Sequence, residues 1–161
     1  MFARLLFCTV LTLSLSSASA FASPADDVNA LLKTVSDGMN KGDAKAAAAA
    51  WADDGDLINP AGVVGKGHAG VEKVLAGDIA TILKGTTSKF TVETTRDLGN
   101  GIWLVDATHE AQNMTGPDGK KMTGKLHVAI VLTTSKDKKL QVAAARPYMY
   151  MPAPPAGKPA K

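Results

Sequence analysis

The spacing of apolar residues changes near Gly85, and this change constrains the fold of the chain more than any other feature. Before Gly85, apolar residues recur every three or four positions, which is typical of amphipathic helices. After it, apolar and polar residues alternate, which is typical of strands with one buried face. Helices followed by strands with short turns predict an α+β fold, in which three N-terminal helices pack on a curved antiparallel sheet.

Three helices are expected in the first half of the chain. The first spans Pro24 to Met39, the second Ala44 to about Ala52, and the third His68 to Leu83. Ser23 and Asp43 can cap the first two helices, because their side-chain oxygens accept hydrogen bonds from free backbone N–H groups. The third helix has the clearest apolar face, formed by Val71, Val74, Leu75, Ile79, Ile82 and Leu83.

Four long strands are expected after Gly85, and the turns between them are rich in Gly, Asn, Asp and Lys. Two shorter extended segments are expected earlier, at residues 57–58 and 63–64. The four long strands are residues 89–97, 102–114, 122–134 and 140–151.

The central hairpin can be aligned residue by residue if Gly116 faces Gly119 across its turn. One face of the hairpin is then almost wholly apolar and is expected to face the helices, while the other is mixed polar. A bulge would shift the register by one residue and exchange the two faces. The expected pairs are Trp103–Leu132, Val105–Ile130, Ala107–Val128 and His109–Leu126 on the apolar face, and Thr108–His127 and Glu110–Lys125 on the polar face.

The first twenty residues are typical of a secretory signal peptide. Arg4 supplies a positive charge, Leu5 to Leu15 form a short apolar run, and residues 18–20 form a small-residue cleavage site. Cleavage is expected after Ala20 or Ala22, which predicts a periplasmic or secreted protein. The apolar run is too short to span a bilayer, so no membrane partner is expected once it is removed.

The composition of the chain limits its chemistry, its partners and the extent of its folded domain. The only cysteine, Cys8, is removed with the signal peptide, so the mature chain is expected to lack disulfides and thiol chemistry. The net charge is only +3 and much of the basic excess lies in turns and near the C-terminus, so no nucleic-acid partner is expected. Residues 152–161 form a Pro-rich tail that cannot bury a core, which places the folded domain at residues 24–151.

The stretch from Trp51 to Val71 carries a family resemblance. A helix ending in Trp-Ala-Asp-Asp, an extended Leu-Ile-Asn-Pro-Ala-Gly, a Gly-Lys-Gly and an amphipathic helix resemble the nuclear-transport-factor-2-like superfamily, within it the SnoaL-like and SgcJ/EcaC-type branch. The junction at Asn40 to Asp43 and the last strand from Leu140 fit as well. The resemblance implies a cystatin-like cone, with one strongly curved antiparallel sheet around a long helix and an open apolar pocket. It also implies a homodimer through the outer face of the sheet.

The resemblance constrains function less, because this superfamily contains enzymes, binding proteins and scaffolds. In the ketosteroid isomerases of this shape, a carboxylate moves a proton and a tyrosine helps to stabilise the oxyanion. The corresponding positions in this chain are Asn59 and Val35. An amide cannot accept a proton near neutral pH and valine cannot donate a hydrogen bond, so this isomerase activity is not expected.

Four residues are candidates for contact with a ligand. His109 is the one ionisable group on the expected inward face, where it could act as a base, contact a ligand or remain a hydrogen-bonded core residue. Trp103 lies on the same face, and Asn59 could reach the pocket floor or simply hold the turn before Pro60. Arg146 depends on the register of the last hairpin. Facing inward it would suit an anionic ligand, and facing outward it would form a surface ion pair.

These residues support three hypotheses about function. The first is an exported domain that binds a small, largely apolar ligand in the cone. The second is a SnoaL-like enzyme without a cofactor, performing proton transfer, isomerisation or cyclisation with His109 as the base. The third is a scaffold with a filled cone. No metal is expected, because Asp53, Asp54 and Asp56 lack the spacing of a calcium loop and are explained by the start of a strand.

Overall fold

The computed structural model describes residues 24–115 and 119–149, which form three helices and one six-stranded sheet. The expectations for residues 1–20, for the Gly116 turn and for residues 152–161 lie outside the described residues. The helices are α1 (Pro24–Lys41), α2 (Ala44–Ala48) and α3 (Gly67–Ala80). The strands are β1 (Trp51–Ile58), β2 (Val64–Lys66), β3 (Thr87–Gly99), β4 (Ile102–Thr115), β5 (Lys121–Thr134) and β6 (Leu140–Tyr148).

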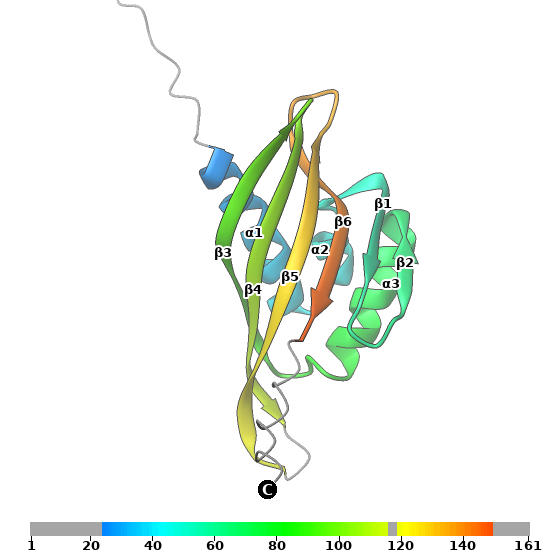
Figure 1. Ribbon diagram of the computed structural model, residues 1–161. Helices are drawn as coiled ribbons and strands as arrows, with labels where there is room; N and C mark the ends of the chain where they lie inside the picture. Colours follow the sequence, from blue (N-terminus) through cyan, green and yellow to red (C-terminus); the bar gives the residue numbers. More distant parts are fainter. Residues whose placement is uncertain (1–23, 116–118, 150–161) are drawn as a thin grey trace, which may run out of the picture.

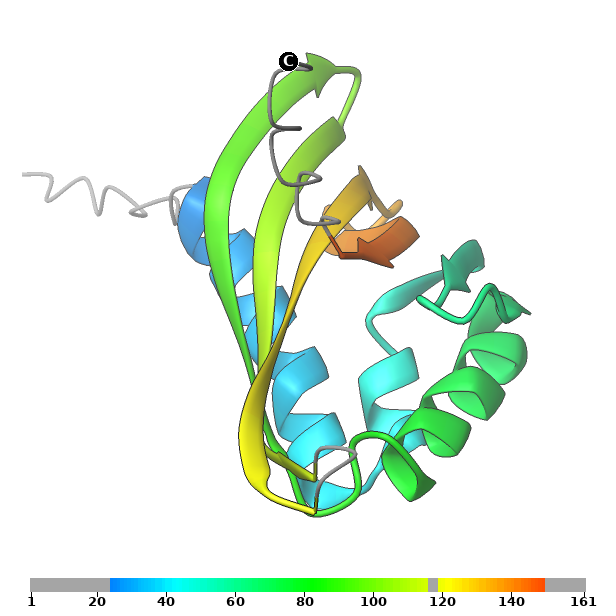
Figure 2. The ribbon, with the colours of Figure 1, turned by 60° about the horizontal axis from the view of Figure 1, so that its bottom comes forward.

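The sheet has the order β2-β1-β6-β5-β4-β3 and wraps around the helices. Figure 1 shows the long strands β3 to β6 lying side by side across α1 and α2. Figure 2 shows that these strands bend strongly, while α3 with β1 and β2 forms the opposite wall. The predicted α+β fold with helices packed on a curved sheet is therefore confirmed. Every described strand pair is antiparallel except β1 and β6, which are parallel.

Small residues allow the helices to approach one another closely. Val28, Leu32 and Val35 of α1 are buried in the core, as the helical spacing predicts. A Cβ atom added at Gly38 of α1 would lie 2.6 Å from the backbone nitrogen of Ala47 in α2. The glycine and the alanine run of α2 therefore allow close contact between these helices.

The second helix is shorter than predicted, and this expectation is wrong. α2 ends at Ala48, and Trp51 begins β1 instead of ending the helix. The backbone N–H of Val142 in β6 donates to the Ala50 carbonyl at 2.8 Å, and the Trp51 indole N–H donates to the Asp56 carbonyl at 3.0 Å. Pairing with β6 therefore outweighs the helix propensity of the alanine run.

The register predicted for the central hairpin is confirmed from Trp103 to Glu110. All six expected pairs between β4 and β5 are present. The register shifts only between Ala111 and Met114, where Asn113 has a φ of 63°. The bulge lies beyond the inward-facing residues, so it leaves both faces as predicted. Val105, Ala107 and His109 are buried against the helices.

Candidate ligand-binding cavity

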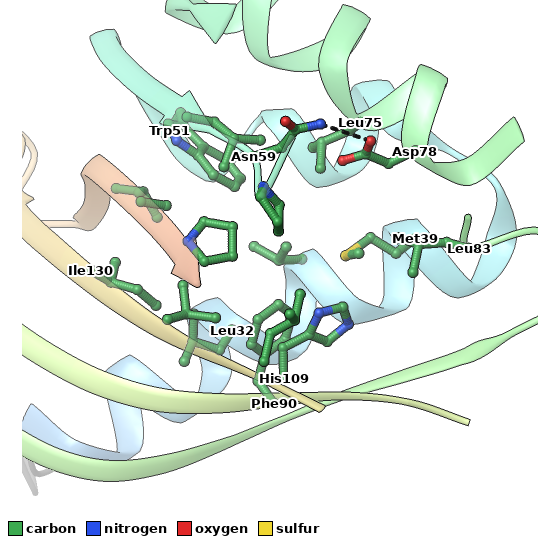
Figure 3. A pocket seen from close by; sticks show the side chains of 18 of the residues that line it. Leu32, Met39, Trp51, Asn59, Leu75, Asp78, Leu83, Phe90, His109 and Ile130 are labelled. Carbon is green, nitrogen blue, oxygen red and sulfur yellow. Dashed lines mark hydrogen bonds between the residues drawn. The ribbon is translucent and has the colours of Figure 1, made fainter. Parts of the chain in front are cut away.

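A cavity of about 80 Å³ lies inside the cone, between the helices and the bent sheet (Figure 3). Helices α1 and α3 and strands β1, β3, β4, β5 and β6 contribute to its lining, which is largely apolar. Pro60 and Ile82 line it and are themselves exposed, so the cavity reaches the surface. A single water needs roughly 10–15 Å³, so the cavity can hold several waters or part of a small organic molecule.

Asn59 orients a second polar residue of the lining. Its side-chain oxygen accepts hydrogen bonds from the backbone N–H groups of Ala61 and Val63, at 3.1 and 3.0 Å. Its amide nitrogen donates to Asp78 at 3.0 Å. Asn59 therefore holds the turn before Pro60, one of the two roles expected for it, and it also lines the cavity. Because its oxygen already accepts two hydrogen bonds, its main effect on the cavity is to hold the Asp78 carboxyl in place.

Asp78 on α3 lines the cavity and was not recognised in the sequence. Half-burial raises the pKa of its carboxyl, and the hydrogen bond from Asn59 opposes this by lowering it. The spacing of residues in the sequence could have identified it. Asp78 follows Val74 by four positions and Leu75 by three, so it occupies the apolar stripe of α3. An acidic residue in such a stripe must face the interior or its edge, which is where Asp78 lies.

His109 on β4 lines the cavity on the side away from the Asn59–Asp78 pair (Figure 3). Its ring stacks on Phe90 of β3, with centroids 4.6 Å apart and planes 16° apart. Burial lowers the pKa of the imidazole to about 4, so the ring is neutral at neutral pH. Its Nε2 atom is buried and has no hydrogen-bond partner among residues 24–115 and 119–149.

Arg146 and Trp103 do not line the cavity. In β6, Pro147 pairs with Val128 and lines the cavity, so Arg146 pairs with Ala129 and lies on the outer face. Its guanidinium binds the Asp56 carboxylate with two hydrogen bonds, of 2.7 and 3.0 Å. The outward register is therefore the one adopted, and the placement of Arg146 inside the cone is wrong. Trp103 is partly buried and packs against the core outside the cavity.

The chemistry of the cavity follows from its few polar groups. Asp78 and His109 are its only ionisable side chains among the described residues, and no Lys or Arg of these residues lines it. The described residues also contain no group of three or more His, Cys, Asp or Glu placed to hold a metal ion. Val35 and Asn59, at the two positions taken from the isomerases, do line the cavity. They place an isopropyl group and a hydrogen-bonded amide at the positions where the resemblance implies a tyrosine hydroxyl and a proton-moving carboxylate.

No protein-family model and no curated protein matches the chain. In the described parts of the chain, no helix is long and apolar enough to cross a membrane.

Several solved structures match the chain as a fold. A domain of unknown function with a cystatin-like fold from Nostoc punctiforme PCC 73102 is 19% identical, covers 81% of each chain and gives a TM-score of 0.69. A ketosteroid isomerase-like protein from Erwinia carotovora atroseptica SCRI1043 is 17% identical over 82% of this chain and 100% of that chain, with a TM-score of 0.68. An NTF-2-like protein of unknown function from Shewanella oneidensis MR-1 is 18% identical over 78% and 99%, with a TM-score of 0.63.

At such low identity the likeness concerns the fold and carries no activity with it. It agrees with the motif at residues 51–71, which implies the same fold. The chain therefore has the cystatin-like fold that nuclear-transport-factor-2-like and ketosteroid isomerase-like proteins share.

Proposed function

We propose that this protein binds a small, largely apolar molecule in the cavity of its cone. One observation carries the proposal: an apolar cavity open to the surface contains a buried imidazole whose Nε2 lacks a partner among the described residues. A buried polar atom without a hydrogen bond is costly, and a ligand inside the cavity could supply that bond. Residues 1–20 support a further part of the proposal, that binding takes place in the periplasm or outside the cell.

The same observation disfavours the other two hypotheses. A scaffold with a filled cone would leave no space beside His109, whereas the cavity lies there. An enzyme using His109 as its base would need an imidazole that readily accepts a proton, but burial lowers the pKa of this ring to about 4. General bases work best when their pKa lies near the working pH, so a binding role fits His109 better than a catalytic one.

The binding role predicts that filling the cavity abolishes binding while the fold is kept. Ala145 of β6 is buried and lines the cavity, so Ala145→Leu should place three more carbon atoms in it. We expect the affinity for benzyl alcohol, a small apolar probe with one hydroxyl, to fall at least about tenfold, since its space is taken. Protein-detected NMR titration measures this affinity. Urea unfolding should show stability unchanged or raised, as is common for substitutions that fill cavities.

The matched control is Ala30→Leu, the same substitution at an exposed position of α1. It should bind the probe as the unaltered protein does. Equal affinity in both variants, or probe shifts confined to residues outside the cavity, would refute the proposed function.

A further inference from the structure

The charges around the cavity limit which ligands it can accept. Its ionisable residues among the described part of the chain are Asp78 and His109. The His109 ring is neutral at neutral pH. Asp78 is either ionised or neutral, so at neutral pH the described lining carries a negative charge or none, and no positive charge. Arg146 lies between two lining residues in the sequence, but its guanidinium binds Asp56 on the other face of the sheet.

The hydrogen-bonding groups around the cavity also limit which ligands it can accept. Asn59 uses its oxygen for two backbone N–H groups and points its amide nitrogen at Asp78. A carboxylate accepts about four hydrogen bonds, and Asn59 supplies one of them. Across the cavity, Nε2 of His109 has no partner among the described residues, and the stack on Phe90 fixes the plane of the ring. Hydrogen-bonding capacity therefore remains at two separated groups, the half-buried Asp78 carboxyl and the buried Nε2 of His109.

We propose that the cavity selects small, largely apolar molecules that carry a hydroxyl or amino group, bound at Asp78, and that it rejects anions such as carboxylates and phosphates. A hydroxyl or protonated amine donates to the Asp78 carboxylate. A hydroxyl can also donate to or accept from Nε2 of His109, whichever tautomer the ring adopts. An anion would be repelled by the ionised Asp78 carboxylate in a half-buried space, and with either state of that carboxyl it would find no cation in the described lining.

This inference rests on the proposed binding function and adds a specificity to it. Asp78 is the specificity-determining residue, and Asn59 is a positioning residue that aims it. The proposal differs from the expectation that Arg146 would receive an anionic ligand, because the guanidinium of Arg146 lies outside the cavity.

Four probes that share one aromatic ring test the specificity at pH 7.5: toluene, benzyl alcohol, benzylamine and benzoate. Their dissociation constants are measured by protein-detected NMR titration of the full mature protein. We expect benzyl alcohol and benzylamine to bind at least about tenfold more tightly than benzoate, because charge repulsion in a poorly solvated site exceeds that factor. Toluene should bind more weakly than benzyl alcohol, since it cannot satisfy Asp78 or His109.

Two variants identify the group responsible. Asp78→Asn removes the charge but keeps a hydrogen-bonding side chain, so the preference for benzylamine over benzoate should fall to about threefold or less. Asp137→Asn makes the same charge change in the exposed turn after β5, away from the cavity, and should leave the preference unchanged. If Asp78→Asn does not fold, Asn59→Ala provides the second measurement, with a weaker preference expected because Asp78 is no longer held.

The outcomes separate the two proposals. If benzoate binds as tightly as benzylamine, or if Asp78→Asn keeps the preference, the specificity is wrong while the binding function stands. If none of the four probes shifts the signals of cavity residues, both are wrong.

Discussion

At the residue scale, the chemistry of the cavity depends on two side chains on different elements, the buried imidazole of His109 on β4 and the half-buried carboxyl of Asp78 on α3. The side that His109 faces was predicted from the sequence, whereas Asp78 was missed. Alternation along the strand and the pairing expected across the hairpin determine that side, and both can be derived from local sequence. Asp78 could have been found as an acidic residue within the apolar stripe of α3. The side of the sheet on which Arg146 lies could not be predicted. It depends on a register shift between Val131 and Leu132 in the pairing of β5 with β6, and no turn residue in the sequence indicates that shift.

His109 should make the stability of the protein depend on pH. Its folded pKa of about 4 lies below the ordinary value of 6.5, so the unfolded chain binds a proton more readily between these pH values. The free energy of unfolding should therefore fall as the pH falls from about 6.5 to about 4, by about 3 kcal/mol from this residue, and stay level below. Urea unfolding of the protein and of His109→Gln at several pH values measures this loss.

His109→Gln has no titrating ring, so its loss of stability over the same range should be smaller by that amount. Carboxyl groups elsewhere contribute equally to both proteins and cancel in the comparison. Parallel pH profiles for the two proteins would show that the ring is not held neutral by burial.

At the element scale, the spacing of apolar residues correctly predicted whether each long element is a helix or a strand. The errors concern where the elements end, because tertiary contacts determine the ends. α3 ends at Ala80, three residues before the predicted end, and residues 81–85 form a turn in which Gly85 has a φ of 71°. The short strand β2 packs against the start of α3. A Cβ at Gly65 would lie 2.7 Å from the carbonyl carbon of Gly70, so these two elements require a residue without a side chain.

Two glycine substitutions should therefore change stability in opposite directions. Gly65→Ala forces backbone atoms of β2 and α3 apart and should lower the free energy of unfolding by about 1–3 kcal/mol. Gly77→Ala, within α3, meets open space and should raise it by about 0.5–1 kcal/mol, because alanine favours the helix. Urea unfolding of both variants gives the values. A neutral Gly65→Ala would mean that β2 does not hold its place against the helix.

At the scale of the whole molecule, we propose a homodimer formed through the outer face of the sheet, as the sequence resemblance implied. An apolar row supports this, in which Leu104, Val131 and Ala144 are neighbours on β4, β5 and β6 and each is partly exposed. The row lies on the same face as the Arg146–Asp56 ion pair. Stable dimers bury about 800 Å² on each partner, an area that a face of four long strands can supply.

The dimer can be tested by sedimentation equilibrium. The protein should be dimeric at high micromolar concentration, and Val131→Lys should weaken association at least about tenfold, since it places a charge at the centre of the apolar row. Val63→Lys makes the same change at an exposed turn and should leave the dimer intact. A protein that stays monomeric before any substitution would contradict the proposal.

The parallel pairing of β1 with β6 also has a consequence for the order of folding. Trp51 of β1 pairs with Val142 of β6. During synthesis, β1 is therefore made well before the strand that it pairs with. Until β6 arrives, β1 and β5 each present an unpaired edge to other chains, which makes the unfinished protein prone to aggregate. Three residues of β6, Val142, Ala145 and Pro147, also close the cavity. The cavity is therefore incomplete until β6 is in place, so a ligand bound there would stabilise only the fully folded chain.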